Sequence, residues 1–220
     1  MSLLTFAFTL ATSIAARAAE VNLTTLDDDD APNYVHLRTG AEYGFVAGVG
    51  YDHAVTVGSR RLLLTSDLTF PWASIDRSDY RFRVGAVLPV ALTYHWRLAA
   101  ALSPTIRHTV NDAATMTGLG ADASATGGYY AHHWFAAAEL GFDWNGITHV
   151  NNSQLYRDTV YDGARDGWYG DYGGNIRTGG QVGASFSRYD VVLRAGVLRD
   201  ASGEVPLLPF YGTLTVAARW

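Results

Sequence analysis

The sequence contains no cysteine, so neither a disulfide framework nor a cysteine metal site can form. Lysine is absent as well, and all 16 basic residues are arginine. The net charge of −5 argues against a nucleic-acid partner, which would require a basic surface. Beyond residue 20, no segment approaches the roughly 18 unbroken apolar residues of a transmembrane helix. The remaining chain is therefore expected to contain no helical membrane span.

The first residues have most features of a secretory signal peptide. An apolar stretch, Leu3–Ile14, is followed by Ala16-Arg17-Ala18, which fits the small-x-small pattern that precedes a cleavage site. We therefore predict a signal peptide over residues 1–18 and a mature domain over residues 19–220. No basic residue precedes the apolar stretch, which leaves a short buried helix as the alternative.

Apolar and polar side chains alternate along much of the remaining chain, the pattern of strands with two different faces. No segment shows the continuous apolar run of a strand in a parallel sheet, so the pattern predicts an all-β, antiparallel fold. The nine alternating segments are Thr39–Tyr51, Arg61–Trp72, Tyr80–Leu92, Trp96–Arg107, Thr117–Tyr130, Trp134–Trp144, Thr178–Phe186, Val191–Val197 and Phe210–Trp220.

The connections between these segments alternate between short and long, and the apolar faces are bracketed by aromatic residues. Aromatic rings favour the boundary between lipid tails and water. Short turns at one end and longer loops at the other are typical of a transmembrane β-barrel. The longest connection, residues 145–177, is predicted to be an extracellular loop. The short connections are Gly58–Arg60, Tyr94-His95, Ala131–His133 and Arg188–Asp190, and the longer ones are Ala73–Asp79, Asn111–Thr115, Asn145–Arg177 and Asp200–Pro209.

The carboxyl-terminal strand, FYGTLTVAARW, alternates throughout and ends on an aromatic residue. In these features the chain resembles the Gram-negative outer-membrane β-barrel proteins, although the motif identifies a broad class and no specific family. The resemblance implies a location in the bacterial outer membrane, contact with its lipid, and recognition of the last strand by the barrel assembly machinery. The residues that would form this assembly signal are Phe210, Leu214, Val216 and Trp220.

Nine strands conflict with the even number that single-chain bacterial barrels usually contain. One solution is a further strand at Glu20–Leu26, with Asp27–Asn33 as the first outer loop, although seven residues are fewer than the roughly 9–11 that a tilted strand needs. The alternative divides Tyr34–Val57 into two strands around Ala47–Gly50. We predict a closed antiparallel barrel of about ten strands, with eight as the next choice.

If the apolar faces contact lipid, the opposite faces point into the lumen. Arginine binds carboxylates through two parallel hydrogen bonds, so buried charges of opposite sign can pair there. We interpret the inward charges as a structural ion-pair network, with a pore for small solutes as the alternative. The predicted network consists of Glu42, Asp67, Arg81, Arg83, Arg107, Asp122, Glu139, Asp143 and Arg194.

The long loop is rich in carboxylates and aromatic rings, which suit hard cations or the surfaces of sugars and proteins. Its spacing does not match an EF-hand, and a solvated loop is the alternative. The candidate residues for an extracellular ligand are Asp158, Tyr161, Asp162, Asp166, Trp168 and Asp171. We predict no cofactor and no metal site, because the adjacent His132 and His133 would face opposite sides of a strand.

Two pairs of residues could combine an acid and a base near the outer rim: Asp143 with His149, and Asp112 with His108. Neither pair belongs to a recognisable catalytic motif, and no G-x-S-x-G sequence is present. We therefore predict a non-enzymatic barrel that serves a structural role or binds a ligand or partner through its outer loops. The alternatives are a hydrolase with an active site at the rim and a secreted soluble β-barrel that binds a small apolar ligand.

Overall fold

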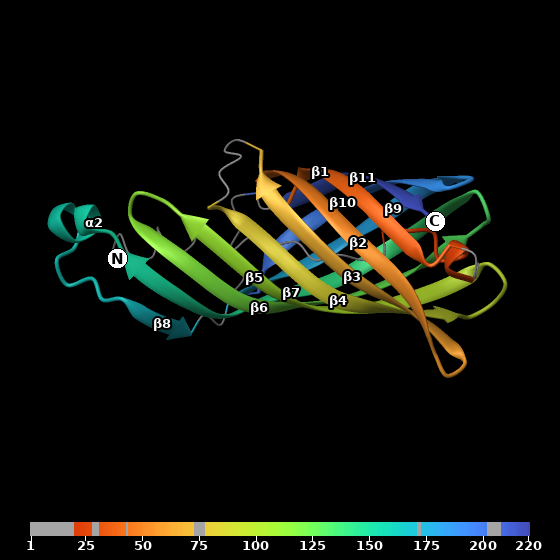
Figure 1. The fold of residues 1–220 in the computed structure, drawn as a ribbon, viewed down its shortest axis with the longest axis horizontal. Coiled ribbons are helices and arrows are strands. Elements are labelled where there is room, and N and C mark those ends of the chain that lie inside the picture. Colours follow the sequence, from red (N-terminus) through yellow and green to blue (C-terminus); the bar gives the residue numbers. More distant parts are fainter. Residues whose placement is uncertain (1–19, 28–30, 43, 73–77, 171–172, 202–207) are drawn as a thin grey trace.

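The computed structural model describes residues 20–27, 31–42, 44–72, 78–170, 173–201 and 208–220, so the predicted signal peptide lies outside it. Antiparallel strands form most of the described chain (Figure 1). The strands are β1 (Asn33–Ala41), β2 (Phe45–Val57), β3 (Arg60–Pro71), β4 (Tyr80–Ala91), β5 (Trp96–Val110), β6 (Ala114–Tyr130), β7 (Trp134–Asn152), β8 (Gly167–Gly170), β9 (Gly174–Phe186), β10 (Tyr189–Asp200) and β11 (Phe210–Arg219). Two short helical segments are η1 (Thr25–Asp27) and α2 (Gln154–Thr159).

Ten of these strands close into a barrel. Each is hydrogen-bonded to the next, and β1 pairs with β11 over Tyr34↔Arg219 to Ala41↔Gly212, which closes the wall. Strand β8 stands outside the closed wall, because it pairs only with the end of β7 that projects beyond β9. The prediction of ten antiparallel strands is confirmed, and the eight-strand alternative is wrong.

The first barrel strand is not the one that we favoured from the sequence. Residues 20–26 form no strand, and the extra strand comes from dividing Tyr34–Val57 into β1 and β2. The division falls between Ala41 and Phe45, before the predicted Ala47–Gly50, and Glu42 N donates to Gly44 O across it at 2.9 Å. Alternation continues through this turn, so the sequence pattern alone did not reveal it.

The connections divide into a turn end and a loop end, which lie at opposite ends of the long axis in Figure 1. The turn end holds the connections at residues 58–59, 92–95, 131–133 and 187–188. Gly58 has a φ of 63° there, a left-handed conformation that glycine adopts at little cost. At the loop end, the start of β6 and the end of β7 extend past β9, with α2 and β8 attached. Strand β7 continues to Asn152 and β9 begins at Gly174, so the loop that we predicted over residues 145–177 is shorter than expected.

The two faces of the wall differ in polarity as the alternation predicted. Exposed apolar side chains cover the outside of every barrel strand, among them Leu37, Val49, Leu64, Phe82, Leu102, Leu140, Val182, Leu193 and Leu214. Charged and polar side chains from the same strands are buried inside, where they form the ion pairs described below. The core of this domain is therefore its lumen.

Candidate functional site

One half of the lumen is organised around Arg38, which is buried on strand β1. Its guanidinium contacts Glu20 at 3.2 Å and Asp67 at 3.1 Å, and its Nε lies 3.5 Å from Glu42. Arg83 approaches Asp67 with two nitrogens, at 2.8 and 2.5 Å, and Arg81 binds Glu42. These contacts join strands β1, β3 and β4 with the amino-terminal segment.

The other half is organised around Glu139 on strand β7. Arg194 reaches its two oxygens from β10, and Arg177 donates from β9 at 2.6 Å. Tyr211 also donates to this carboxylate at 3.3 Å, and its ring lies 5.1 Å below the guanidinium carbon of Arg194. Arg194 further contacts Glu20 at 3.5 Å, so Glu20 connects the two halves. Buried charges require partners of this kind, because an unpaired charge inside a protein is strongly destabilising.

The structure places the three remaining residues of the predicted network within the same wall. Arg107 is the cross-strand neighbour of Arg81 on β5. Asp122 lies 3.5 Å from Arg177 and is directly opposite Asp143 across β6 and β7. Asp143 is buried, and its oxygens accept no hydrogen bond from the described residues. The network therefore includes one pair of neighbouring carboxylates as well as ion pairs.

Three central members of the network were missing from the sequence prediction: Glu20, Arg38 and Arg177. Arg38 and Arg177 lie one residue before the predicted segments that begin at Thr39 and Thr178. Extending each segment by one residue would have included both. The side chain of Arg177 fits because residue 141 is glycine. A Cβ added at Gly141 would lie 2.1 Å from Nη2 of Arg177. Glu20 gave no comparable signal, because it belongs to no strand.

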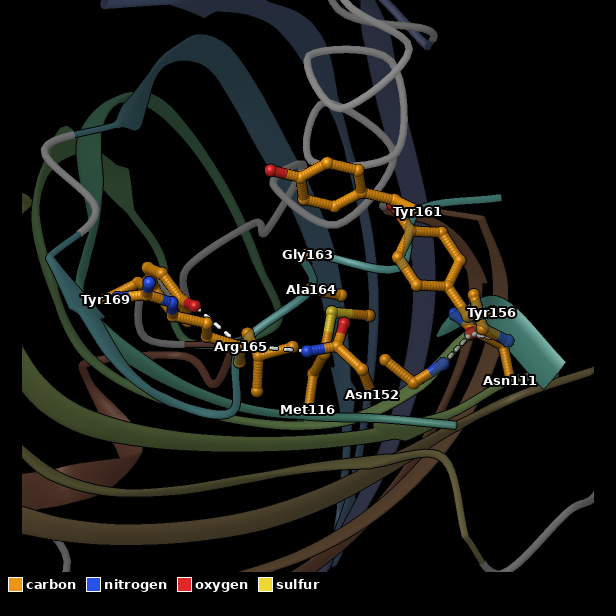
Figure 2. Close-up of a pocket in the computed structure, with 12 residues that line it drawn as sticks. Asn111, Met116, Asn152, Tyr156, Tyr161, Gly163, Ala164, Arg165 and Tyr169 are labelled. Carbon is orange, nitrogen blue, oxygen red and sulfur yellow. Dashed lines mark hydrogen bonds between the residues drawn. The ribbon is translucent and has the colours of Figure 1, made fainter. Parts of the chain in front are cut away.

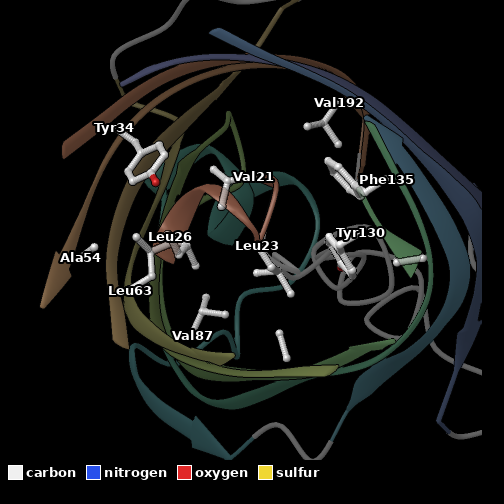
Figure 3. Close-up of a cluster of buried hydrophobic side chains, with 12 residues drawn as sticks. Val21, Leu23, Leu26, Tyr34, Ala54, Leu63, Val87, Tyr130, Phe135 and Val192 are labelled. Carbon is white, nitrogen blue, oxygen red and sulfur yellow. The ribbon is translucent and has the colours of Figure 1, made fainter. Parts of the chain in front are cut away.

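The amino-terminal segment, residues 20–27, lies inside the lumen at the turn end and is called the plug below. Figure 3 shows its apolar side chains Val21, Leu23 and Leu26 within the ring of strands. All three are buried in the apolar cluster. The wall residues of this cluster are Tyr34, Ala54, Leu63, Val87, Ala99, Tyr130, Phe135, Ala137 and Val192. The lumen thus changes from charged to apolar toward the turn end.

Polar contacts hold the backbone of the plug in place. Asn22 donates to Ala131 O at 2.9 Å and to Ser185 Oγ at 3.0 Å. Arg97 donates to Leu23 O at 3.1 Å, and Arg61 donates to Leu26 O. The plug therefore satisfies its polar groups while filling one end of the barrel.

The residues that we predicted for an extracellular ligand do not form one site. Asp158 accepts from Gln154 at 3.1 Å, Asp166 binds Arg157 and Asn152, and Asp162 is exposed. Trp168 lies against His149, with ring centroids 5.1 Å apart. Asp171 lies outside the described residues.

Of the five that the structure describes, Tyr161 alone lines the pocket at the loop end (Figure 2). This pocket, called the loop pocket below, has a volume of about 460 Å³. It lies between the projecting ends of β6 and β7 and the chain that follows β7. Its lining consists of Asn111, Ala113, Ala114, Met116, Val150, Asn152, Tyr156, Tyr161, Gly163, Ala164, Arg165 and Tyr169.

The pKa of Asp166 is lowered because its carboxylate accepts hydrogen bonds from neighbouring residues. Arg157 hydrogen-bonds to one oxygen, and the backbone N–H of Asn152 donates to the other at 2.8 Å. These donors favour the carboxylate and lower the pKa of Asp166 from 3.8 to about 2. Asp166 is therefore ionised throughout the neutral range and anchors the loop to β7.

The carboxyl-terminal strand completes the wall. Phe210, Leu214 and Val216 face outward, and Trp220 is exposed at the turn end. The backbone N–H of Trp220 donates to Asn33 O at 3.1 Å, and the backbone N–H of Asn33 donates to Trp220 O, also at 3.1 Å. The terminal aromatic thus stands where the last strand meets the first.

The proposed acid–base pairs are not assembled. Asp143 is buried in the lumen, whereas His149 packs against Trp168 on the projecting part of the sheet. His108 instead contacts Thr117 at 2.9 Å and stacks near Tyr80, while the Asp112 backbone oxygen accepts from Ser153. Within the described ranges, no group of three or more acidic or histidine side chains is placed to hold a metal ion.

Neither helical segment in the described part of the chain is long and apolar enough to cross a membrane. A comparison of the sequence with protein-family models and with curated proteins finds no match to either.

Proposed function

We propose that this protein is an integral β-barrel of the bacterial outer membrane, with a lumen closed by ion pairs and by the plug. Its activity in this proposal is the binding of a ligand or partner at the loop end. The barrel itself is a rigid support that presents the loops. Catalysis is not part of the proposal, because neither candidate acid–base pair is brought together.

The outward apolar band bounded by aromatic rings is the observation that carries this proposal. On β7 the boundaries are Trp134 near the turn end and Trp144 near the loop end, ten residues apart. At about 3.3 Å per residue, that separation is roughly 33 Å along the strand. A tilt of about 40° reduces it to roughly 25 Å along the barrel axis, the height of the apolar band in outer-membrane barrels.

Aromatic side chains also gather at the turn end of neighbouring strands. The ring of Tyr129 lies 6.1 Å from that of Trp96 and stacks 5.3 Å from that of Trp134. Tyr189 and Trp220 are exposed at the same end. Such a girdle suits the level of the lipid headgroups, where amphipathic rings contact both lipid and water.

The polarity of the two faces argues against the alternative of a soluble barrel with an apolar ligand inside. That alternative requires the apolar stripes to line a cavity, whereas they cover the outside of this barrel. In water, an apolar band around the whole wall would expose far more than the few hundred Å² that soluble monomers tolerate as one patch. Lipid is the environment that removes this cost.

Lumen packing favours a closed barrel over a pore for small solutes. Arg81, Arg177 and Arg194 are fully buried, and the plug occupies the turn end. Wide aqueous channels belong to barrels of about 16 strands or more. The loop end, with the projecting ends of β6 and β7 and its pocket, is the part that differs from a plain barrel and is left for binding.

Membrane fractionation with electrophoresis tests the proposal. We expect the protein to sediment with outer membranes, to resist extraction by high salt, and to require detergent for release. A folded barrel should migrate faster before boiling than after boiling. Recovery in the soluble periplasmic fraction without detergent would contradict the proposal.

A further inference from the structure

The loop pocket is a preformed site, because hydrogen bonds fix the chain around it. Ser153 donates its N–H to Ala113 O at 2.8 Å and its hydroxyl to Asp112 O at 2.6 Å. The same hydroxyl accepts from the Tyr156 N–H at 3.0 Å and caps α2. These bonds tie the start of the loop to the β5–β6 turn.

The far wall of the pocket is fixed in a similar way. Asn152 donates to Arg165 O at 2.9 Å, and the Tyr169 hydroxyl donates to the same oxygen at 2.6 Å. Asp166 holds Arg157 and the Asn152 backbone. The pocket therefore needs no large rearrangement before it accepts a ligand, which reduces the entropic cost of binding.

The lining is largely apolar and contains three tyrosines with Met116 and Val150. Figure 2 shows the rings of Tyr156 and Tyr161 on one side and Met116 below them. Rings and a thioether provide broad, polarisable surfaces that suit a flat apolar body. The volume of about 460 Å³ lies within the range of about 300–1,000 Å³ that is usual for small-molecule sites.

Among the polar groups in the lining, the guanidinium of Arg165 can only donate hydrogen bonds, whereas the phenolic hydroxyls can donate or accept. The side-chain amides of Asn111 and Asn152 already bond to neighbouring backbone atoms. The phenolic groups of Tyr156 and Tyr161 and the guanidinium of Arg165 form no hydrogen bond or ion pair with the described part of the chain. No aspartate or glutamate belongs to the lining. The pocket therefore combines an apolar surface with one unmatched positive charge.

We propose that the loop pocket binds a small aromatic molecule that carries a carboxylate. The ring system lies among the tyrosines and Met116, and the carboxylate pairs with Arg165 and the phenolic groups. This proposal rests on the proposed function, because it identifies the class of ligand that the loop end binds. Arginine matches a carboxylate with parallel hydrogen bonds, which gives the site its preference for an anion.

Two other ligand classes fit the pocket less well. Tyrosine clusters can hold quaternary ammonium groups through cation–π attraction, but the positive Arg165 opposes a cation in the same pocket. A neutral sugar would gain nothing from the charge of Arg165, and the described part of the lining has no carboxylate to accept from its hydroxyl groups. Both classes therefore serve as comparison ligands.

The test measures the binding of three naphthalene derivatives of similar size to the full barrel reconstituted in phospholipid vesicles. The probes are naphthoate, neutral naphthamide and the cation naphthylmethyl-trimethylammonium, and calorimetry or probe fluorescence gives their affinities. We expect naphthoate to bind most tightly. The substitution Arg165→Gln should weaken its binding about tenfold, the effect of losing one charge-assisted contact, without weakening naphthamide binding.

Matched controls lie at the opposite end of the barrel. Arg188→Gln removes an exposed arginine from the β9–β10 turn, and Tyr94→Ala removes an exposed tyrosine from the β4–β5 turn. Neither should change the affinity for naphthoate. Tyr161→Ala should weaken naphthoate and naphthamide alike, by about fivefold to tenfold, because it removes a ring contact common to both.

Several results would overturn the inference. These are equal binding of the three probes, preference for the cation, no saturable binding of naphthoate at millimolar concentration, or equal effects of Arg165→Gln and Arg188→Gln. The heat-dependent shift on the gel is recorded for every sample. A normal shift without naphthoate binding would refute the ligand class alone, whereas failure to enter vesicles would refute the proposed membrane location.

Discussion

The outer and inner faces of the barrel wall are made by the same strands but have opposite chemistry. On β7, Leu140 points outward with 57% of its surface exposed, and the preceding Glu139 is buried in contact with two arginines. In a water-soluble barrel the apolar residue would be inside. The comparison indicates that the hydrophobic effect does not hold the charged part of this wall around its lumen, because apolar burial inside is concentrated at the turn end, where the plug packs. Backbone hydrogen bonds and ion pairs stabilise the inside, and we propose that lipid surrounds the outside.

Among substitutions on the outer face, we expect the largest effect on barrel assembly at Trp220, the last residue of the sequence. Trp220→Asp places a charge where β11 joins β1, and we expect it to abolish assembly, with loss of the barrel from outer membranes. Trp168→Asp is the matched control, because Trp168 is similarly exposed but lies on β8, outside the closed wall. Normal outer-membrane levels of the Trp220 variant would contradict the role of this residue in assembly.

The inner face depends on charge pairing, so the second largest effect is expected from Arg194→Leu. The substitution removes two bonds to Glu139 and the contact with Glu20. Breaking a buried ion pair costs about 3–5 kcal/mol, because the remaining carboxylate loses compensation. Urea unfolding in vesicles should show this loss. Arg188→Leu in the exposed turn is the control, and equal stability of the two variants would show that the lumen pairs contribute little.

The outer face can also be tested in the middle of the wall. Leu140→Arg should reduce the free energy of unfolding in vesicles by about 2–4 kcal/mol if this position lies near the bilayer midplane. Leu155 on α2 is exposed to a similar extent, at 60%, but lies at the loop end. We expect Leu155→Arg to have almost no effect. Equal stability of the two variants would show that the outward apolar face does not contact lipid.

A smaller effect should distinguish the apolar end of the lumen from its charged middle. Asn22→Ala removes the donor to Ala131 O and Ser185 Oγ, so the plug loses these bonds to the β6–β7 turn and to strand β9. Leaving these acceptors unsatisfied should cost about 1–3 kcal/mol in unfolding experiments. The exposed Asn151→Ala serves as control. If both variants unfold alike, these hydrogen bonds do not stabilise the plug.

The smallest effect is expected from a change to Asp166, in the loop that projects beyond the barrel wall. The pKa of Asp166 is lowered from 3.8 to about 2, so its pairing stabilises the loop above about pH 4 and is lost as the pH falls toward 2. The amide resonance of Asn152 should titrate with this low midpoint, and Asp166→Asn should remove the titration. A midpoint near 4 would show that the contacts with Arg157 and Asn152 do not persist in solution.

Sequence reasoning predicted the barrel because alternation reports the two faces of a strand locally. The strands β3, β4, β7 and β11 could be predicted from alternation within each segment, without information about neighbouring strands. The number of ten strands followed from the even number that single-chain bacterial barrels usually contain. The candidate ligand site was harder to predict. Carboxylates such as Asp158 and Asp166 attracted attention as ligand groups, but they are used to fix the loop, whereas Tyr156, Arg165 and Tyr169 became pocket residues because the loop folds back against the end of β7.

The sequence by itself determined which side chains share a face, because a strand turns its side chains to opposite sides at every step. It did not determine that residues 20–27 lie inside the lumen, since a short alternating segment has the same pattern in a wall or in a plug. Only the tertiary structure decided that β1 ends at Ala41 and β2 begins at Phe45, because closure required β1 to pair with both β2 and β11. The same holds for the ion pairs of Glu20, Arg38 and Arg177, whose partners are far apart in the chain and meet only when the barrel closes.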